Sequence, residues 1–546
     1  MPDVVVVGAG HNALVAACYL AREGLDVQVV ERDSIVGGGV STVERFPGYR
    51  VDRGAGAHLM IRHTGIPEDL GLAECGLTYI DCDPWAFAPF AEGDLTFTTD
   101  LRRTCASIAA TCGGRDADAY HRFVTEWGER SARIFTAFQH PPTPLNLGAG
   151  LLGLGRAVGL GPGGGVSGAE LARQFLAPGD QLLDEYFTDE RLKTALAWLS
   201  VPYGPPTHQV GTANQVGWLA MMHRVTPGRP QGGSGMLSAA LAERFLRSGG
   251  ALRLGDGAAR ITRGPGGGVD GVLTESGEHV PAASVLAGCH VLTTCELLGD
   301  EALLARARRG VRVGNGSGMA VRLGTSALPR YPGAPPGAHH GMQLLARSRA
   351  QLRRAYGDFL AGRPPDEPAV LALTLSASDP SIAPPGRHMV SLWGQWHPYD
   401  LATGEYWPAI AERECTKLIM QLDRVAPGFA ESVEHVYVQT PHDIEAELGM
   451  RRGNVMHVEM GLDAMFALRP LPELAGYRTP VAGLYLTGAS THPGGGVFGA
   501  SGRSAATVIL DDRRASPASR ATSMLGRAVA FGSAAGSAVR ARARRP

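Results

Sequence analysis

The sequence predicts an α/β fold in which a Rossmann-like, dinucleotide-binding domain is interleaved with a second, α+β domain. Three observations predict this fold. A strand, a glycine turn and a helix open the chain, a second strand followed by glycines lies near residue 490, and 546 residues exceed the roughly 100–200 of a single domain. If both units belong to one parallel sheet, the chain must leave that sheet and later return to it.

The composition is that of a globular protein with little net charge. Hydrophobic residues make up 44% of the chain and charged residues 19%, which excludes a disordered or coiled-coil protein. The net charge of -1 offers no electrostatic case for nucleic acid, whose binding needs a basic face. We therefore expect no nucleic-acid partner.

The cysteines and the N-terminus bear on location. The 8 cysteines contain no C-x-x-C pair, so neither a redox dithiol nor a zinc site is expected, and no metal ligands are assigned. The apolar run at residues 4–7 lacks a preceding basic segment and is too short to span a membrane. A reducing cytoplasm fits these features best.

Residues 4–31 predict a nucleotide site. Four valines form a buried strand, Gly8 allows a tight turn, Gly10 lets a pyrophosphate approach the N-terminus of the next helix, and small Ala13 permits close helix–strand packing. A second strand ends at Glu31, about 20 residues later, where an acid accepts hydrogen bonds from ribose. This unit alone does not separate FAD from NAD.

A second glycine cluster favours FAD. Gly37, Gly38 and Gly39 follow the ribose acid closely, where the backbone must again pass near a phosphate or ribityl chain. Nicotinamide dehydrogenases have no such cluster.

The C-terminal region again predicts a strand, a turn of small residues and a helix. Residues 483–490 predict a short buried strand that ends in a small-residue turn, and glycines at 494–496 lead into a small-residue helix through Ala505 and Ile509. Amide donors at the start of that helix would face the pyrimidine end of a flavin, where negative charge grows on reduction.

Together with residues 232–237, these motifs resemble the phytoene-dehydrogenase-like branch of FAD-dependent oxidoreductases. That branch includes carotenoid desaturases, oxygenase-type carotenoid ketolases and pyridine-nucleotide-disulfide-oxidoreductase-domain proteins. Residues 77–84 and 104–109 are most similar to the ketolase-like subgroup. The resemblance covers about residues 1 to 510 and implies the amine-oxidase/phytoene-desaturase type of fold.

The resemblance also implies non-covalently bound FAD and its contacts. The candidate cofactor-binding residues are Gly8, Gly10, Ala13, Glu31, Arg32, Gly37, Gly38, Gly39, Ala258, Gly488, Ala489, Gly496 and Val497. Gly39 stands where many relatives have Arg or Ala, and Ala258 replaces the more usual Val. The turn at residues 287–290 departs from the family pattern, so no role is carried over to it.

The expected domains follow from these positions. Residues 1–100, 231–295 and 470–512 form the FAD-binding domain, residues 101–230 and 296–469 form the substrate-binding domain, and residues 513–546 form a basic tail. Within them we expect helices over 116–137, 237–248 and 406–425, a strand over 251–254 and a hairpin turned at 264–268.

Three features of the middle and the end of the chain remain open. The aromatic and Met-rich stretches 198–203, 218–222 and 393–399 suit a pocket for an apolar or conjugated molecule, or are ordinary core. The loop at 147–168 is a lid, a membrane-dipping element or a plain surface loop. The arginine-rich tail binds an anionic membrane surface peripherally or is a plain chain end.

The first functional hypothesis is a dehydrogenase. A flavin takes a hydride onto N5 from a C–H bond while a neighbouring proton leaves, which creates a double bond. The expected substrate is apolar or polyene-like, and because no second NAD(P)H fingerprint follows, the expected electron acceptor is oxygen or a quinone. His58 and His492 are the candidate proton acceptors, each with a structural alternative.

Other functions use the same frame. A flavin oxygenase or ketolase would insert oxygen into a similar substrate, and an amine oxidase usually shows an aromatic pair near the C-terminal motif, where Phe498 stands alone. A non-catalytic binding protein on this fold would have decayed glycine clusters, whereas the clusters here are intact. The oligomeric state stays open.

Overall fold

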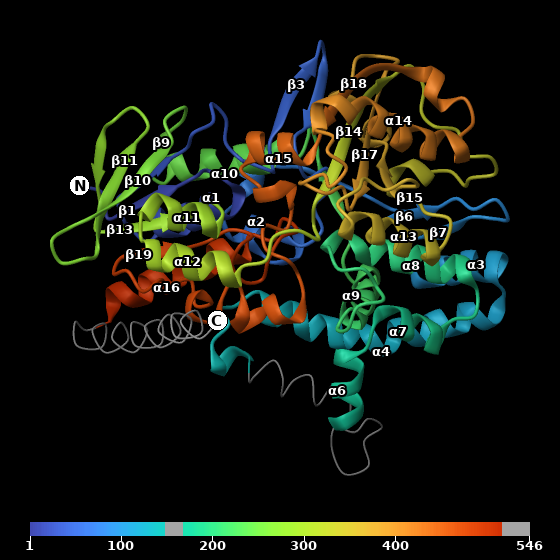
Figure 1. Ribbon diagram of the computed structural model, residues 1–546, viewed down its shortest axis with the longest axis horizontal. Coiled ribbons are helices and arrows are strands. Elements are labelled where there is room, and N and C mark those ends of the chain that lie inside the picture. Colours follow the sequence, from blue (N-terminus) through green and yellow to red (C-terminus); the bar gives the residue numbers. More distant parts are fainter. Residues whose placement is uncertain (148–167, 516–546) are drawn as a thin grey trace.

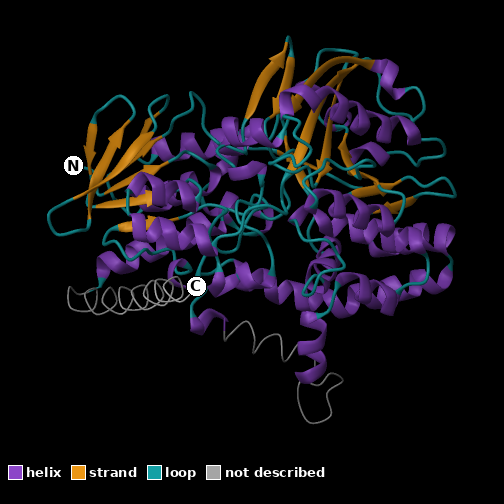
Figure 2. Ribbon diagram, viewed as in Figure 1, coloured by secondary structure: helices purple, strands orange, loops and turns teal. Residues whose placement is uncertain are grey.

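The computed structural model describes residues 1–147 and 168–515. Strands gather at two ends of the molecule, and helices fill the space between and beneath them (Figure 1, Figure 2). In the described part of the chain no helix has both the length and the apolar character needed to cross a bilayer. Residues 148–167, which make up nearly all of the loop predicted at 147–168, and the tail beyond 515 lie outside the described residues.

The first sheet is parallel throughout and has five strands in the order β19-β13-β1-β2-β9. These are β1 (Val4–Val7), β2 (Val27–Val30), β9 (Ala251–Arg253), β13 (Ser284–Ala287) and β19 (Leu484–Leu486). They come from three distant stretches of the chain. The prediction that both ends of the chain build one parallel sheet is therefore confirmed.

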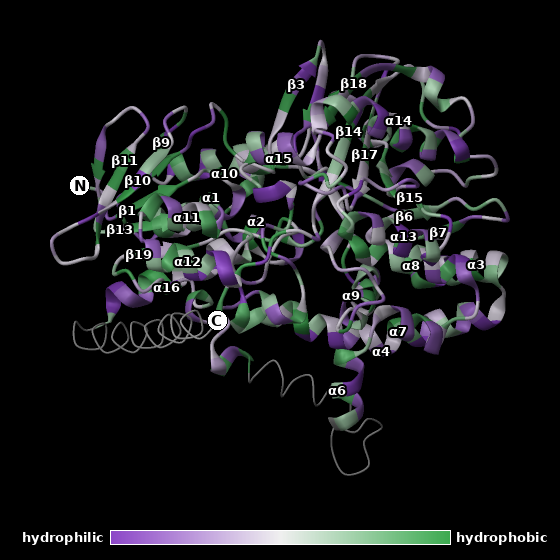
Figure 3. Cartoon of the chain, in the orientation of Figure 1, coloured by the Kyte–Doolittle hydropathy of each residue, from purple (hydrophilic) through white to green (hydrophobic). Residues whose placement is uncertain are grey.

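Both faces of this sheet are covered, which explains its run of valines. Val4 and Val6 pack against one face, and Val5 and Val7 against the other, because successive strand residues alternate in direction. The first face carries α1 (His11–Arg22), α10 (Gly235–Arg247) and α16 (Ala500–Arg514). The second carries α11 (Val291–Leu298), α12 (Glu301–Gly310) and an antiparallel sheet of β10 (Ala258–Arg263), β11 (Val269–Thr274) and β12 (His279–Pro281). Hydrophobic residues follow the strands of this region (Figure 3).

The small-residue helix α16 packs unusually close to α1. A Cβ placed on Gly502 would lie 2.1 Å from the backbone oxygen of Asn12, so only glycine fits there. This contact brings the N-terminal ends of the two helices together, and residues at or just before both ends line the cavity described below.

The second sheet is larger and mixed, with the order β18-β14-β17-β16-β15-β6-β7. Its strands are β6 (Ala86–Ala88), β7 (Leu95–Phe97), β14 (Gly318–Thr325), β15 (Met342–Leu345), β16 (Val370–Leu373), β17 (His388–Gln395) and β18 (Val433–Gln439). Helix α14 (Trp407–Val425) packs on one face. Because β6 and β7 belong to this sheet, residues 1–100 contribute strands to both sheets. Helix α12 packs on the first sheet although it follows residue 296. The expected domain bounds remain predictions.

The remaining elements connect the two sheets. Two short ribbons pair β3 (Thr42–Phe46) with β4 (Tyr49–Asp52) and β5 (Tyr79–Asp81) with β8 (Gly228–Pro230). The helices are α2 (Ile66–Asp69), α3 (Leu101–Cys112), α4 (Gly114–Phe138), α6 (Gly168–Leu176), α7 (Gly179–Tyr186), α8 (Glu190–Ser200), α9 (Ala213–Trp218), α13 (Arg349–Leu360) and α15 (Pro441–Leu448). The helices expected over 116–137, 237–248 and 406–425 thus form within two residues of their predicted bounds, and so does the hairpin at 264–268.

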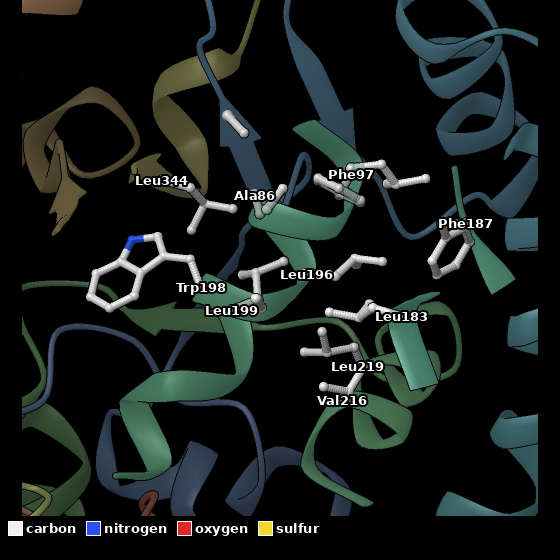
Figure 4. Packing of buried hydrophobic residues seen from close by; sticks show 14 of the residues in the cluster. Ala86, Phe97, Leu183, Phe187, Leu196, Trp198, Leu199, Val216, Leu219 and Leu344 are labelled. Atoms are coloured by element: carbon white, nitrogen blue, oxygen red, sulfur yellow. The ribbon is translucent and has the colours of Figure 1, made fainter. Parts of the chain in front are cut away.

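The aromatic stretches of the middle region mostly form core. Side chains of α8, among them Leu196 and Trp198, pack between Leu344 on one side and Leu183 with Phe187 on the other (Figure 4). Trp198 is fully buried and donates its indole N–H to the carbonyl of Val370. The structural alternative for stretch 198–203 therefore holds for Trp198.

Candidate active site

A cavity of about 800 Å³ lies where the two sheets meet. On one side it is bounded by the carboxyl ends of β1 and β2, which is where open α/β sheets bind their ligands. All thirteen candidate cofactor-binding residues line it: Gly8, Gly10, Ala13, Glu31, Arg32, Gly37, Gly38, Gly39, Ala258, Gly488, Ala489, Gly496 and Val497. The fold thus brings segments from four parts of the sequence to one space.

The two N-terminal glycine segments are joined to each other. Gly10 and Gly37 form a parallel bridge, and the Gly37 N–H donates to the carbonyl of Ala9 at 2.8 Å. Gly37 has φ +113, and a Cβ there would lie 2.2 Å from the oxygen of Val40, so the residue must be glycine. A Cβ on Gly10 would meet no protein atom within 4 Å, because that position faces the open cavity at the start of α1.

Glu31 fixes the turn after β1. One carboxylate oxygen accepts the Ala9 N–H at 2.6 Å and the other accepts the Asp33 N–H at 2.9 Å. The same side chain lines the cavity, where carboxylate oxygens can accept further hydrogen bonds. Glu31 therefore shapes the nucleotide turn as well as facing the space in which a ribose would lie.

The C-terminal segment closes the opposite wall. Gly488 and Gly496 have φ +93 and +108, and a Cβ on Gly496 would again meet nothing within 4 Å. Val497 has φ +55, a left-handed conformation that costs a β-branched residue of order 1–3 kcal/mol. Such strain persists only where the surroundings enforce it, and here it lies in the wall of the cavity.

Arg469 holds this wall in place. Its guanidinium is fully buried and donates only to carbonyl groups, including those of Ala489 at 2.6 Å and Thr491 at 3.3 Å, and that of Met456 at 2.8 Å. Burial lowers the pKa of Arg469 to about 9. No sequence motif marks this residue, because its partners are backbone atoms that only the fold brings together.

The residues present fit a dinucleotide. The positions that face the cavity at Gly10 and Gly496 carry no side chain, and both stand beside helix starts that have no side-chain cap. Backbone N–H groups at such helix ends bind phosphate and other anions. In addition, Nε2 of His11, the first residue of α1, is buried in the cavity wall without a hydrogen-bond partner.

Neither candidate proton acceptor lines the cavity. His58 is fully buried and shares hydrogen bonds with the Tyr79 hydroxyl at 3.0 Å and the Ser234 hydroxyl at 2.7 Å. His492 is also fully buried, with Nε2 3.3 Å from the carbonyl of Ala137. Their assignment as proton acceptors stays a prediction, and the geometry favours the structural alternative for both.

Three other histidines line the cavity: His11, His290 and His457. His290 caps α11 by accepting the Leu292 N–H, and its Nε2 lies 3.1 Å from the carbonyl of His457. His457 has φ +62, and its Nδ1 lies 3.2 Å from the Ser490 hydroxyl. His11 stands inside the glycine motif and could have been found from the sequence, whereas nothing in the sequence around His457 points to the site.

Burial holds several histidines neutral, which makes stability fall in mild acid. It lowers the pKa of His11, His290 and His492 to about 4, below the value of 6.5 in the unfolded chain. The unfolded state therefore binds more protons below pH 6.5, and stability is lost as the pH falls from there toward 4. Each such histidine contributes a loss of about 2 kcal/mol at pH 5.

Urea denaturation at about pH 7.5 and pH 5 measures this effect. We expect a lower midpoint at the acid pH, and a smaller difference in the variant His492→Gln than in the exposed control His121→Gln. Equal midpoints at the two pH values would contradict the burial of neutral histidines.

The second sheet provides the other wall of the cavity. Its lining residues are Ala320, Arg322, Met342, Leu371, Leu373, Ser391, Trp393 and Gln439. Of the aromatic stretches, Trp393 and, from stretch 198–203, Pro202 reach the cavity, whereas Trp218, Met221 and Met222 are buried in core clusters. The glycine-rich segments around Gly8, Gly37 and Gly496 are called the nucleotide cradle below. One continuous space therefore joins this cradle to a largely apolar sheet.

Comparison with known proteins agrees with this division. A family profile described as an NAD(P)-binding Rossmann-like domain matches residues 6–64. The chain is 32% identical to pyridine nucleotide-disulfide oxidoreductase domain-containing protein 2 of Rattus norvegicus over 93% of each chain, and 29% identical to phytoene dehydrogenase of Streptomyces griseus over 90% of this chain and 92% of that one. A structure of putrescine oxidase bound to putrescine superposes with a TM-score of 0.59 at 15% identity, covering 94% of this chain and 99% of that one.

Proposed function

Because this chain belongs to the phytoene dehydrogenase and amine oxidase family of FAD-dependent oxidoreductases, we propose that it uses non-covalently bound FAD to dehydrogenate an apolar or conjugated small molecule. One observation carries the proposal: the cavity of about 800 Å³ is continuous from the glycine cradle to the apolar face of the second sheet. A substrate on that face would lie directly beside a flavin held in the cradle.

The residues of the cradle bind and orient the cofactor. The backbone at Gly8 and Gly10 and the N-terminal end of α1 would hold the pyrophosphate, and Glu31 would accept hydrogen bonds from the adenosine ribose. Gly488, Ala489, Gly496 and Val497 would hold the flavin end. The bound FAD supplies the hydride acceptor.

Two features support non-covalent binding and a dry site. Cys289, the cysteine among the lining residues, has its backbone nitrogen 3.9 Å from a Cβ placed on Gly8, in the turn that would face the diphosphate. Burial also raises the pKa of the Cys289 thiol, so the thiol stays protonated and unreactive. Met342, Leu371 and Leu373 exclude water where the substrate would lie.

Anaerobic mixing of the purified protein with an apolar polyene tests the reaction. Bleaching of the flavin absorption together with a product that has lost two hydrogen atoms supports dehydrogenation, and return of the colour on adding oxygen or a quinone identifies the acceptor. A product that has gained an oxygen atom only when oxygen is present would replace dehydrogenation by the oxygenase or ketolase alternative. Oxidation of a diamine but of no polyene would favour an amine oxidase.

We place the protein in the cytoplasm, with peripheral contact to anionic membranes through the arginines after residue 515. Co-sedimentation with phosphatidylserine vesicles checks this contact. The full chain is expected to bind them at low salt and a chain ending at residue 515 is not; equal binding by both would contradict the contact.

A further inference from the structure

One face of the second sheet forms the floor of the substrate half of the cavity, and its chemistry changes steadily from strand to strand. In the register of the sheet, Arg322 of β14 pairs with Ser391 of β17, Ser391 pairs with Leu373 of β16, and Leu373 pairs with Met342 of β15. Directly paired residues lie on the same face of a sheet, and all four line the cavity. The row therefore runs from a cation through a hydroxyl to two apolar side chains.

A neighbouring row repeats this order. Gln439 of β18 pairs with Ala320, Ala320 with Trp393, and Trp393 with Leu371, and these four residues also line the cavity. The amide oxygen of Gln439 is buried and has no hydrogen-bond partner. The floor is thus polar at Arg322, Ser391 and Gln439 and apolar at β15 and β16.

Arg322 is the charged group at the polar end. The residue is only 4% exposed. Its guanidinium donates from Nε to the carbonyl of Asp52 at 3.0 Å, from Nη1 to the Ser391 hydroxyl at 2.8 Å and from Nη2 to the carbonyl of Gly54 at 3.4 Å. A guanidinium has five N–H donors, so one N–H on each Nη remains. Two adjacent donors of this kind match the two oxygens of a carboxylate or phosphate.

Asp52 and Glu447 attract the charge of Arg322 from a distance, but neither forms a direct ion pair with it. Within the described residues no carboxylate lies within ion-pair distance of its guanidinium, and the Asp52 carboxylate is bound instead by Arg229 at 2.7 Å. A purely structural anchor for residues 52–54 would need donors but no charge, and a buried cation without a directly hydrogen-bonded counter-ion is costly. An anionic ligand would supply that counter-ion.

We infer that Arg322 is a specificity-determining residue that binds an oxyanion at one end of the substrate, whose apolar chain lies over Leu371, Leu373 and Met342. The substrate class is then an amphiphile with a carboxylate or phosphate head, rather than a neutral hydrocarbon. This inference rests on the proposed function, because it assigns the same cavity to the substrate of that reaction.

Ligand selectivity of the flavin-loaded protein tests the inference. The probes are decanoate, decyl phosphate, decanol and decylamine, and their binding is followed by the change that they cause in the flavin absorption spectrum. We expect at least one of the two oxyanions to bind roughly tenfold or more tightly than decanol, because a hydrogen bond to a charged group contributes about that much affinity. We expect decylamine to bind most weakly, because its charge repels that of Arg322. The stronger of the two oxyanions identifies the head group.

Variants assign the selectivity to Arg322. Arg322→Met is expected to bind oxyanion and alcohol equally, Arg322→Lys to keep part of the preference, and Arg347→Met, which removes a surface arginine paired with Glu367, to keep all of it. Ser391→Ala, which removes one anchor of the guanidinium, should weaken oxyanion binding more than decanol binding. If Arg322→Met is insoluble, the selectivity of the unaltered protein and of Ser391→Ala decides.

Each outcome separates the inference from the proposed function. Equal binding of oxyanion and alcohol by a protein that holds flavin and is bleached by a polyene overturns the inference and leaves the proposed function standing. Oxyanion preference that survives in Arg322→Met also overturns it. A protein that takes up no flavin overturns the proposed function, and the inference with it.

Discussion

Replacing Gly10 by valine is expected to leave a folded protein that carries at most about a tenth of the flavin of the unaltered chain. The backbone at Gly10 is extended, with φ −65 and ψ 155, which any residue adopts, and a Cβ there touches no protein atom within 4 Å. The valine methyl groups would instead project into the space where the pyrophosphate approaches α1. A loss of about 1.4 kcal/mol in binding free energy already reduces affinity tenfold.

Flavin content and thermal stability of the flavin-free protein measure this outcome together. Gly266→Val is the matched control, because Gly266 is exposed in the β10–β11 turn and its Cβ also meets nothing within 4 Å. The control should keep its flavin, and both variants should melt near the unaltered apoprotein. Full flavin content in Gly10→Val would show that the cofactor does not lie against this turn.

Replacing Arg229 by methionine is expected to destabilise the protein by about 3–5 kcal/mol, the cost of leaving a buried carboxylate without its cation. Arg229 is 1% exposed, lies 2.7 Å from one oxygen of Asp52 and 3.8 Å from one of Asp379, and donates to the carbonyl of Gly56. These partners come from two segments far apart in the chain, residues 52–56 and Asp379, which Arg229 joins. The pair therefore holds the nucleotide half and the sheet half of the site together.

The free energy of unfolding from urea denaturation measures this loss. Arg247→Met, which removes an exposed helix-surface ion pair with Glu243, is the control and should change stability by no more than about 1 kcal/mol. A change in Arg229→Met as small as in the control would contradict the assignment of this pair as a buried connection between the two halves.

The elements with local signals could be predicted from the sequence. The valine strand β1, the turn from Gly8 to Gly10 and the helix α1 need only neighbouring residues to be recognised, and so does the hairpin at 264–268. The cradle could also be predicted, because each glycine cluster is recognisable by itself in the sequence as a place where the backbone must approach a ligand closely. All thirteen predicted cofactor residues therefore line one cavity.

The substrate half could not be predicted, because it depends on register between strands. Arg322, Ser391 and Leu373 are separated by many residues in the chain and become neighbours only through the pairing of β14, β17 and β16. Composition is also a poor guide here: Trp198 and Met221 suggested a pocket but are core, whereas the polar Arg322 and Gln439 line it. His58 and His492 stand beside glycine motifs in the sequence, but both are fully buried and neither lines the cavity, so their role as proton acceptors stays a prediction.

The most direct test of the account is the flavin content of the purified protein, measured in the supernatant after denaturation. The account predicts about one FAD per chain, released unchanged because no covalent bond holds it. A protein that contains no flavin, and that gains none when it is incubated with FAD in the folded state, would contradict the account at its centre.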